Sequence, residues 1–143
     1  FGALAVGLSV LLRVTALGSL VAAGGLRAVA AWIAAEAASR GAMVKLWHDL
    51  PSARPDGMAD RVGQPDDQAT LIALIASVVI VAMAIIPTFG IWAALTGTAI
   101  LIAAGFACAR LFLSQIGGHT GDTLGTAQQC TAIAFLIAMT PFA

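Results

Sequence analysis

The feature that most constrains the fold is an uncharged stretch that runs from Gln68 to Ala109. Its length is about twice the ~20 residues that a helix needs to cross a bilayer. Near its middle lies Pro87-Thr88-Phe89-Gly90. Proline and glycine this close together indicate a turn. The stretch therefore predicts a helical hairpin whose arms cover residues 69–86 and 91–113.

The composition assigns the whole chain to the same class. Hydrophobic residues make up 60% of it and charged residues only 10%, whereas soluble domains carry about 25% charged residues. A soluble domain of this size leaves much of its surface exposed and could not bury so much apolar area. We expect an all-α polytopic membrane protein, with the lipid bilayer as its surroundings.

Three further apolar stretches, residues 2–23, 26–50 and 123–143, bring the expected number of transmembrane helices to about five. Together they predict a single membrane domain over residues 1–143, with a loop at residues 51–68. The chain enters an apolar run at Phe1 without the charged region or cleavage site of a signal peptide. We expect it to be an N-terminally truncated chain.

The charges predict the orientation. Nine of the fourteen acidic and basic residues lie between Arg40 and Asp67, together with most of the prolines. The positive-inside rule places this loop in the cytoplasm. Two spans later the chain returns to the same side at residues 110–122, so the two most polar segments are predicted at one face. Zero net charge gives no basic footprint for nucleic acid, and homo-oligomerisation stays open.

The densest polar segment is Gly117–Gln129, which lies between two apolar runs. Gly117, Gly118 and Gly121 allow the backbone to approach a ligand closely. Asp122 is expected at the N-cap of the following helix. A helix N-terminus binds anions, and Mg²⁺ between the Asp122 carboxylate and a phosphate would remove their repulsion. The pattern predicts an anion site that uses a metal.

Beyond the cap, Asp122, Gly125 and Gln129 are spaced to share one face of the helix. Gly125 has no side chain to obstruct that face, which would suit a ligand the size of a head group. An ordinary capped helix, whose glutamines bond to a neighbouring helix, explains the pattern equally well. His119 could act as an acid, a base or a hydrogen-bond donor.

The loop supplies a second constellation. Arg54 could clamp a phosphate through its fork, and Asp56 and Asp60 could share a metal. An ordinary solvated turn explains this segment better when it is taken alone, because Pro-Asp-Gly is itself a strong turn signal.

A third constellation lies within the apolar helices. Glu36 and Arg40 are four residues apart, in the order that favours an ion pair on a helix. The alternative is that Arg40 has a role in function. Arg13 is isolated in an apolar helix and needs a partner or an interface; Glu36 is a candidate partner.

At these residues the chain resembles a known family. The segment Gly117–Gln129, Gly-Gly-His-Thr-Gly-Asp-Thr-Leu-Gly-Thr-Ala-Gln-Gln, closely resembles the C-terminal signature of the cobalamin synthase family, the adenosylcobinamide-GDP ribazoletransferases. Residues Ser39–Val44 are similar to its Ser-Arg-Trp-Ala-Met-Val motif, and residues Ala53–Met58 to its Ala-Arg-Pro-(acidic)-Gly-Leu loop. Residues Phe1–Ala5 resemble the start of a family helix, so the likeness covers the whole chain.

The resemblance implies a multi-pass enzyme of the bacterial cell inner membrane that acts in cobalamin biosynthesis. Such an enzyme joins adenosylcobinamide-GDP to α-ribazole or its 5′-phosphate, releases GMP and depends on Mg²⁺. The candidate catalytic residues are Asp122, His119 and Arg54, and the candidate metal ligands are Asp122 and Asp56. The candidate substrate-binding residues are Arg40, Gly117, Gly118, Thr120, Gly121, Thr123, Gly125, Gln128 and Gln129.

The chain departs from the family pattern in three ways. Gly41 stands where the family has Trp, and Ala132 where it usually has Glu. The family's principal acidic motif lies upstream of the point where this chain starts, so the isolated chain is expected to lack metal ligands and activity. The stretch Asp56–Asp60 matches that motif only by coincidence.

Two other functions remain as alternatives. A membrane CDP-alcohol-type phosphotransferase would use similar metal chemistry, but Asp56–Arg61 does not match its signature. A small transport subunit would need a polar pathway, and the hairpin offers only scattered Ser77, Thr88, Thr96 and Thr98.

Overall fold

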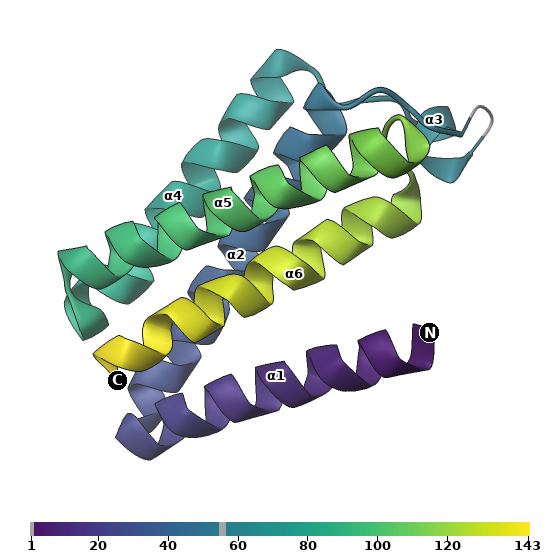
Figure 1. The fold of residues 1–143 in the computed structure, drawn as a ribbon. Helices are drawn as coiled ribbons and strands as arrows, with labels where there is room; N and C mark the ends of the chain where they lie inside the picture. Colours follow the sequence, from purple (N-terminus) through teal and green to yellow (C-terminus); the bar gives the residue numbers. More distant parts are fainter. Residues whose placement is uncertain (1, 55–56) are drawn as a thin grey trace.

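The computed structural model describes residues 2–54 and 57–143, and the all-helical class is confirmed, with no named strand in these ranges. Five long helices and two short ones follow one another along the chain (Figure 1). The long helices are α1 (Gly2–Ala23), α2 (Gly25–Asp49), α4 (Asp67–Phe89), α5 (Ile91–Ile116) and α6 (Gly121–Met139). The short ones are α3 (Met58–Val62) and the 3₁₀ helix η1 (Thr140–Phe142).

The expected count of five membrane spans is not confirmed. Of the helices described, three are long and apolar enough to cross a bilayer, namely α1, α4 and α5. The other two long helices carry the intramembrane polar groups: α2 has four charged residues before Asp49, and α6 has an acidic residue and a pair of glutamines. These polar helices lie inside the bundle. α2 packs against α1, α4, α5 and α6, and α6 packs against α1, α2 and α5.

Several helix ends differ from the sequence-based expectation. α5 ends at Ile116 and not at residue 113, and α6 covers Gly121–Met139 and not residues 123–143. α4 continues through Pro87 to Phe89 and ends at Gly90, whose φ is 89°. Proline is tolerated there because it lies in the last turn, where only one main-chain bond is lost. Residues 58–62 of the predicted loop form α3. α4 begins where the Asp66 side chain accepts a hydrogen bond from the Ala69 N–H, at 2.7 Å.

The connections alternate between the two ends of the bundle (Figure 1). The N-terminus, the α2–α4 connection and the α5–α6 connection lie at one end, and the α1–α2 turn, the α4–α5 turn and the C-terminus lie at the other. We call the first end the loop end. The two polar segments therefore share one end of the molecule, as the charge distribution predicted.

Apolar packing fills both halves of the bundle. The half far from the loop end is filled by side chains of all five long helices, with the alanines of α2 between α4 and α6. Its fully buried members include Leu20, Ile85, Phe135, Leu136 and Met139. A smaller cluster lies beneath the loop end and comprises Leu46, Leu50, Phe112, Leu124 and Ala127. In a bilayer such contacts stabilise the bundle by van der Waals packing, because lipid tails are as apolar as the side chains themselves.

Glycine allows the closest contact between α2 and α4. A Cβ atom added to Gly41 would lie 2.5 Å from Ser77 Oγ and 2.9 Å from Ser77 Cβ. Small residues at such interfaces let helix backbones approach closely in a membrane. Gly41, which stands where the family that the chain resembles has Trp, is therefore a packing residue between α2 and α4.

We expect Gly41→Ala to lower the free energy of unfolding by about 1–3 kcal/mol, because the added methyl overpacks this interface. Gly41→Ala with Ser77→Gly should recover part of that loss. Unfolding in mixed detergent micelles would measure both. Gly25→Ala is the matched control, since nothing lies within 4 Å of a Cβ at Gly25. A Gly41→Ala protein as stable as the wild type would contradict the packing described.

Candidate functional site

The two polar segments are joined at the loop end by main-chain pairing. Ser52 and His119 form an isolated parallel bridge. The Ala53 N–H donates to the His119 carbonyl oxygen at 2.9 Å, and the His119 N–H donates to the Pro51 carbonyl oxygen at 2.8 Å. This pairing fixes the start of α6 against the loop that carries Arg54.

Glycine permits this contact. A Cβ atom at Gly118 would collide with the carbonyl oxygen of Pro51. The neighbouring Gly117 ends α5 in the left-handed conformation, with φ 75°, and its N–H donates to the Leu113 carbonyl oxygen at 3.1 Å. Both glycines therefore have a backbone role, one in turning the chain and the other in docking it.

His119 is almost completely buried, with 1% of its surface exposed. Its Nδ1 lies 3.0 Å from the Leu50 carbonyl oxygen, and since a carbonyl only accepts, Nδ1 carries the proton. The Nε2 atom has no partner among the described residues. The main-chain N–H, the main-chain carbonyl and Nδ1 of His119 all bond to residues 50–53, so this side chain fastens the loop to the start of α6.

A small polar pocket of about 400 Å³ adjoins His119. Its other lining residues come from the loop and α3: Pro51, Ser52, Ala59, Asp60, Gly63 and Gln64. Gln64 closes one side, because its Nε2 donates to the carbonyl oxygens of Trp47 and Leu50. The pocket is thus built across the same junction between loop and α6.

The prediction that Asp122 is the N-cap is wrong. The N-cap of α6 is Thr120, whose Oγ1 accepts a bond from the Thr123 N–H at 3.3 Å. In return, Thr123 Oγ1 accepts from the Thr120 N–H at 2.8 Å. This reciprocal capping starts the helix at Gly121, and both threonines, predicted to bind substrate, are engaged in it.

Asp122 consequently lies in the first turn of α6. It is exposed, and its carboxylate has no partner within the described ranges. A Cβ atom added to Gly121 or Gly125 would meet nothing within 4 Å. The Asp122 carboxylate and the surroundings of Gly125 are therefore open on the surface of α6.

Arg54 is exposed at the loop end, and no bond of its guanidinium is found among the described residues. Its carbonyl oxygen accepts from the Gly57 N–H at 3.1 Å, as expected of the predicted turn. The predicted metal ligand Asp56 lies outside the described residues. Asp60 lines the polar pocket beside His119.

A second polar cluster links α1, α2 and α6, away from the loop. Arg13 Nη1 lies 2.8 Å from Glu36 Oε1, and Arg40 Nη1 lies 2.8 Å from Glu36 Oε2. Both expected pairings of Glu36 are confirmed. Arg13 Nη2 also donates to Gln129 Oε1 at 2.7 Å. The contact between Arg13 and Gln129 was missed from the sequence, because no spacing rule relates residues on α1 and α6.

The carboxylates of the described residues limit how a metal could be held. No group of three His, Cys, Asp or Glu side chains that could hold a metal occurs among the residues described. Asp122 alone offers an exposed carboxylate in the capping segment. This arrangement fits one protein ligand to Mg²⁺, which commonly takes one or two carboxylates and completes its coordination with substrate phosphates and water.

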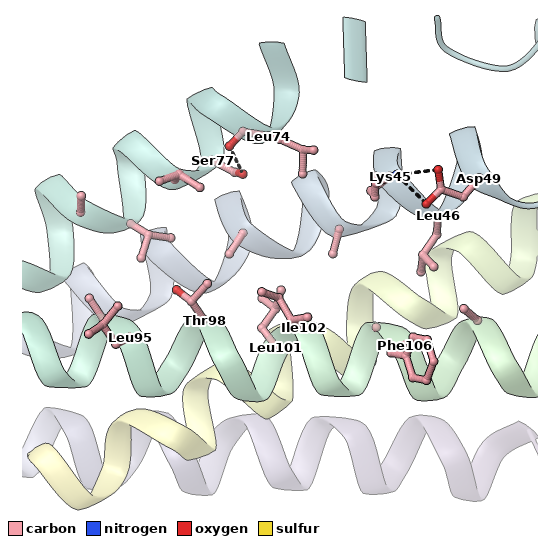
Figure 2. A pocket seen from close by; sticks show the side chains of 18 of the residues that line it. Lys45, Leu46, Asp49, Leu74, Ser77, Leu95, Thr98, Leu101, Ile102 and Phe106 are labelled. Atoms are coloured by element: carbon pink, nitrogen blue, oxygen red, sulfur yellow. Dashed lines mark hydrogen bonds and ion pairs between the residues drawn. The ribbon is translucent and has the colours of Figure 1, made fainter. Parts of the chain in front are cut away.

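A groove of about 600 Å³ is formed by α2, α4 and α5. Figure 2 shows its wall, where Leu95, Leu101 and Phe106 of α5 face α2 and α4. Its charged lining residues are Lys45 and Asp49, which pair with each other at 2.6 Å. The rest of its lining is apolar except for the hydroxyl side chains of Ser77 and Thr98.

Comparison with known proteins identifies the family. The family model described as cobalamin-5-phosphate synthase matches residues 1–140. The chain belongs to this family.

Curated relatives support the assignment. An adenosylcobinamide-GDP ribazoletransferase of Rhizobium etli (strain CIAT 652) is 42% identical over 140 residues, which cover 97% of this chain and 54% of the relative. The protein of the same name in Brucella ovis is 41% identical over 112 residues, covering 78% of this chain and 43% of the relative. The chain spans about half the length of these relatives. No solved structure matches it.

Two positions at which the chain departs from the family pattern, Gly41 and Ala132, lie in the interior of the bundle. Gly41 lies at the α2–α4 contact, and Ala132 is buried, with 1% exposure, within the bundle. A glutamate at position 132 would bring a carboxylate into that interior, where an uncompensated charge is costly. Neither departure lies at the junction between the loop and α6.

We expect Gly118→Ala to separate the loop from α6, because the new methyl would collide with a main-chain oxygen. Overpacking and the lost pairing together should cost about 2–4 kcal/mol. Limited proteolysis of residues 51–66 would then become faster than in the wild type. Gly121→Ala is the matched control, since the space around Gly121 is open. Equal cleavage rates of all three proteins would contradict the junction.

Proposed function

We propose that this chain forms part of an adenosylcobinamide-GDP ribazoletransferase. In this reaction a hydroxyl of α-ribazole or of its 5′-phosphate attacks the phosphorus that carries adenosylcobinamide. One P–O bond forms, the bond to the bridging oxygen breaks, the electron pair leaves with GMP, and the hydroxyl proton is released to water. The observation that carries the proposal is the main-chain pairing of His119 with residues 51–53. It holds the two segments that carry the family resemblance next to each other in a member of that family, which supports a shared site.

The roles of the residues follow from their surroundings. Arg54 is exposed beside the junction and can bind a phosphate through its guanidinium. His119, enclosed by its bonds to residues 50–53, positions the start of α6. Gly125 leaves room along α6 for the substrate. Because phosphoryl transfer needs mainly positioning and electrostatic stabilisation, the site requires no covalent intermediate on the protein.

Mg²⁺ is the cofactor we propose, with the Asp122 carboxylate as one of its ligands and Asp56 as a second. When bound, it would neutralise negative charge on the diphosphate. The exposed position of Asp122 in the first turn of α6 supports this assignment.

We place the protein in the bacterial inner membrane, with the loop end in the cytoplasm. The concentration of charged residues between Arg40 and Asp67 supports this orientation. Nucleotide and ribazole substrates, both water-soluble, would then reach the site without crossing the bilayer. The apolar lining of the groove between α2, α4 and α5 gives no support to the transport alternative.

The decisive measurement is product analysis. The intact protein in proteoliposomes should release GMP from adenosylcobinamide-GDP when α-ribazole and Mg²⁺ are supplied, and neither substrate alone should suffice. Product formed from a CDP-activated alcohol, without GMP release, would instead support the phospholipid-type alternative.

Asp122→Ala should reduce GMP release by at least about 10²-fold, because it removes a charged group proposed to act in the transition state. Asp67→Ala is the matched control: Asp67 is also exposed in the first turn of a long helix. The two variants therefore lose a similar helix-dipole interaction. If both retain wild-type turnover, Asp122 has no place in the site.

A further inference from the structure

The polar cluster on α1, α2 and α6 carries an unbalanced charge. Its charged members are the guanidiniums of Arg13 and Arg40 and the single carboxylate of Glu36, so its net charge is +1. About a quarter of the side chain is exposed in both Arg13 and Glu36. A charge that is largely removed from water is costly unless it has a partner. Glu36 is shared by two arginines, so the surplus positive charge can be taken up by a further anion at Arg40, the more exposed of the two.

The donors for such an anion are present. Arg40 uses Nη1 for both of its bonds, to the carboxylate and to the carbonyl oxygen of Glu36. Its Nη2 and Nε have no partner in the described part of the chain, and 58% of the Arg40 side chain is exposed. A guanidinium with two free N–H directions is suited to bidentate binding of a phosphate.

The cluster is also continuous with the face of α6 that begins at Asp122. Gln129 is bound by Arg13 and lies about 10 Å along the helix from Asp122. Between them, Gly125 leaves open space. A ligand held at Asp122 through a metal could extend along this face toward the two arginines.

We propose that the Arg13–Glu36–Arg40 cluster is an anion subsite that takes a phosphate group of the nucleotide-activated substrate. Arg40 binds the phosphate. Arg13 is a positioning residue: it holds one oxygen of Glu36, so this carboxylate is shared and does not fully neutralise Arg40. Its bond to Gln129 aligns α1 with α6. The identity of the anion as substrate phosphate rests on the proposed function, whereas the anion subsite itself does not.

The test asks whether the affinity for an anion follows the net charge of the cluster. Inorganic diphosphate is titrated into the intact protein in neutral detergent with EDTA present, and its dissociation constant is measured by calorimetry. Arg13→Gln makes the cluster neutral and should weaken binding about tenfold, because the Glu36 carboxylate then neutralises Arg40 alone. Glu36→Gln raises the cluster charge to +2 and should strengthen binding.

The double variant Arg13→Gln/Glu36→Gln restores a net charge of +1. We expect its affinity to return toward that of the wild type, although it has lost more structural bonds than either single variant. Arg40→Gln should abolish binding. Arg27→Gln is the control, because Arg27 lies near the other end of α2, over the ring of Phe89 at 5.8 Å.

These outcomes separate the possible roles. If affinity falls further in the double variant than in Arg13→Gln, the cluster is structural and the proposal is wrong. The same follows if diphosphate does not bind the wild type, or binds all variants equally. The predicted order of affinities without any GMP release would retain the anion subsite and overturn the proposed function instead.

Discussion

The structure depends on the contact between the α2–α4 connection and the start of α6. Two main-chain bonds, at 2.8 and 2.9 Å, and the bond from His119 Nδ1 to Leu50 join these segments. They are 69 residues apart along the chain. The contact satisfies main-chain groups around Gly118 and His119 that are buried within the loop end. It also brings the exposed Asp122 and Arg54 to the same end of the bundle.

The second constraint is the cost of polar groups in an apolar bundle. α2 and α6 carry most of these groups and lie among the three helices that are apolar enough to face lipid. Glu36 then bonds to arginines of two different helices, and Gln129 accepts from the same Arg13. A cluster of this kind ties α1 to its neighbours, since the N-terminal part of α1 is otherwise exposed. In the proposed function it also extends the site from the loop end into the bundle.

In the candidate site, the residues expected to meet a ligand are open at the surface, whereas the residues that hold the backbone are packed or hydrogen-bonded. Gly118 touches Pro51, and Thr120 and Thr123 cap each other, so these parts of the signature are structural. The environment of Gly125 is open, and Asp122 is exposed. One short signature thus combines residues that build the site with residues available to a substrate. This division explains why the spacing of Asp122, Gly125 and Gln129 alone could not distinguish a ligand-binding face from an ordinary capped helix.

The sequence by itself determined the helical membrane class, the five long helices and the placing of both polar segments at one end. These follow from hydrophobic run length and from charge, which are local properties. The sequence misplaced the cap of α6, because competition between Thr120 and Asp122 depends on where the preceding turn ends. Only the tertiary structure decided that Arg13 reaches Gln129, that Gly41 packs on Ser77 and that His119 is enclosed by residues 50–53. Each of these contacts joins residues far apart in the chain, and their formation depends on how the helices pack.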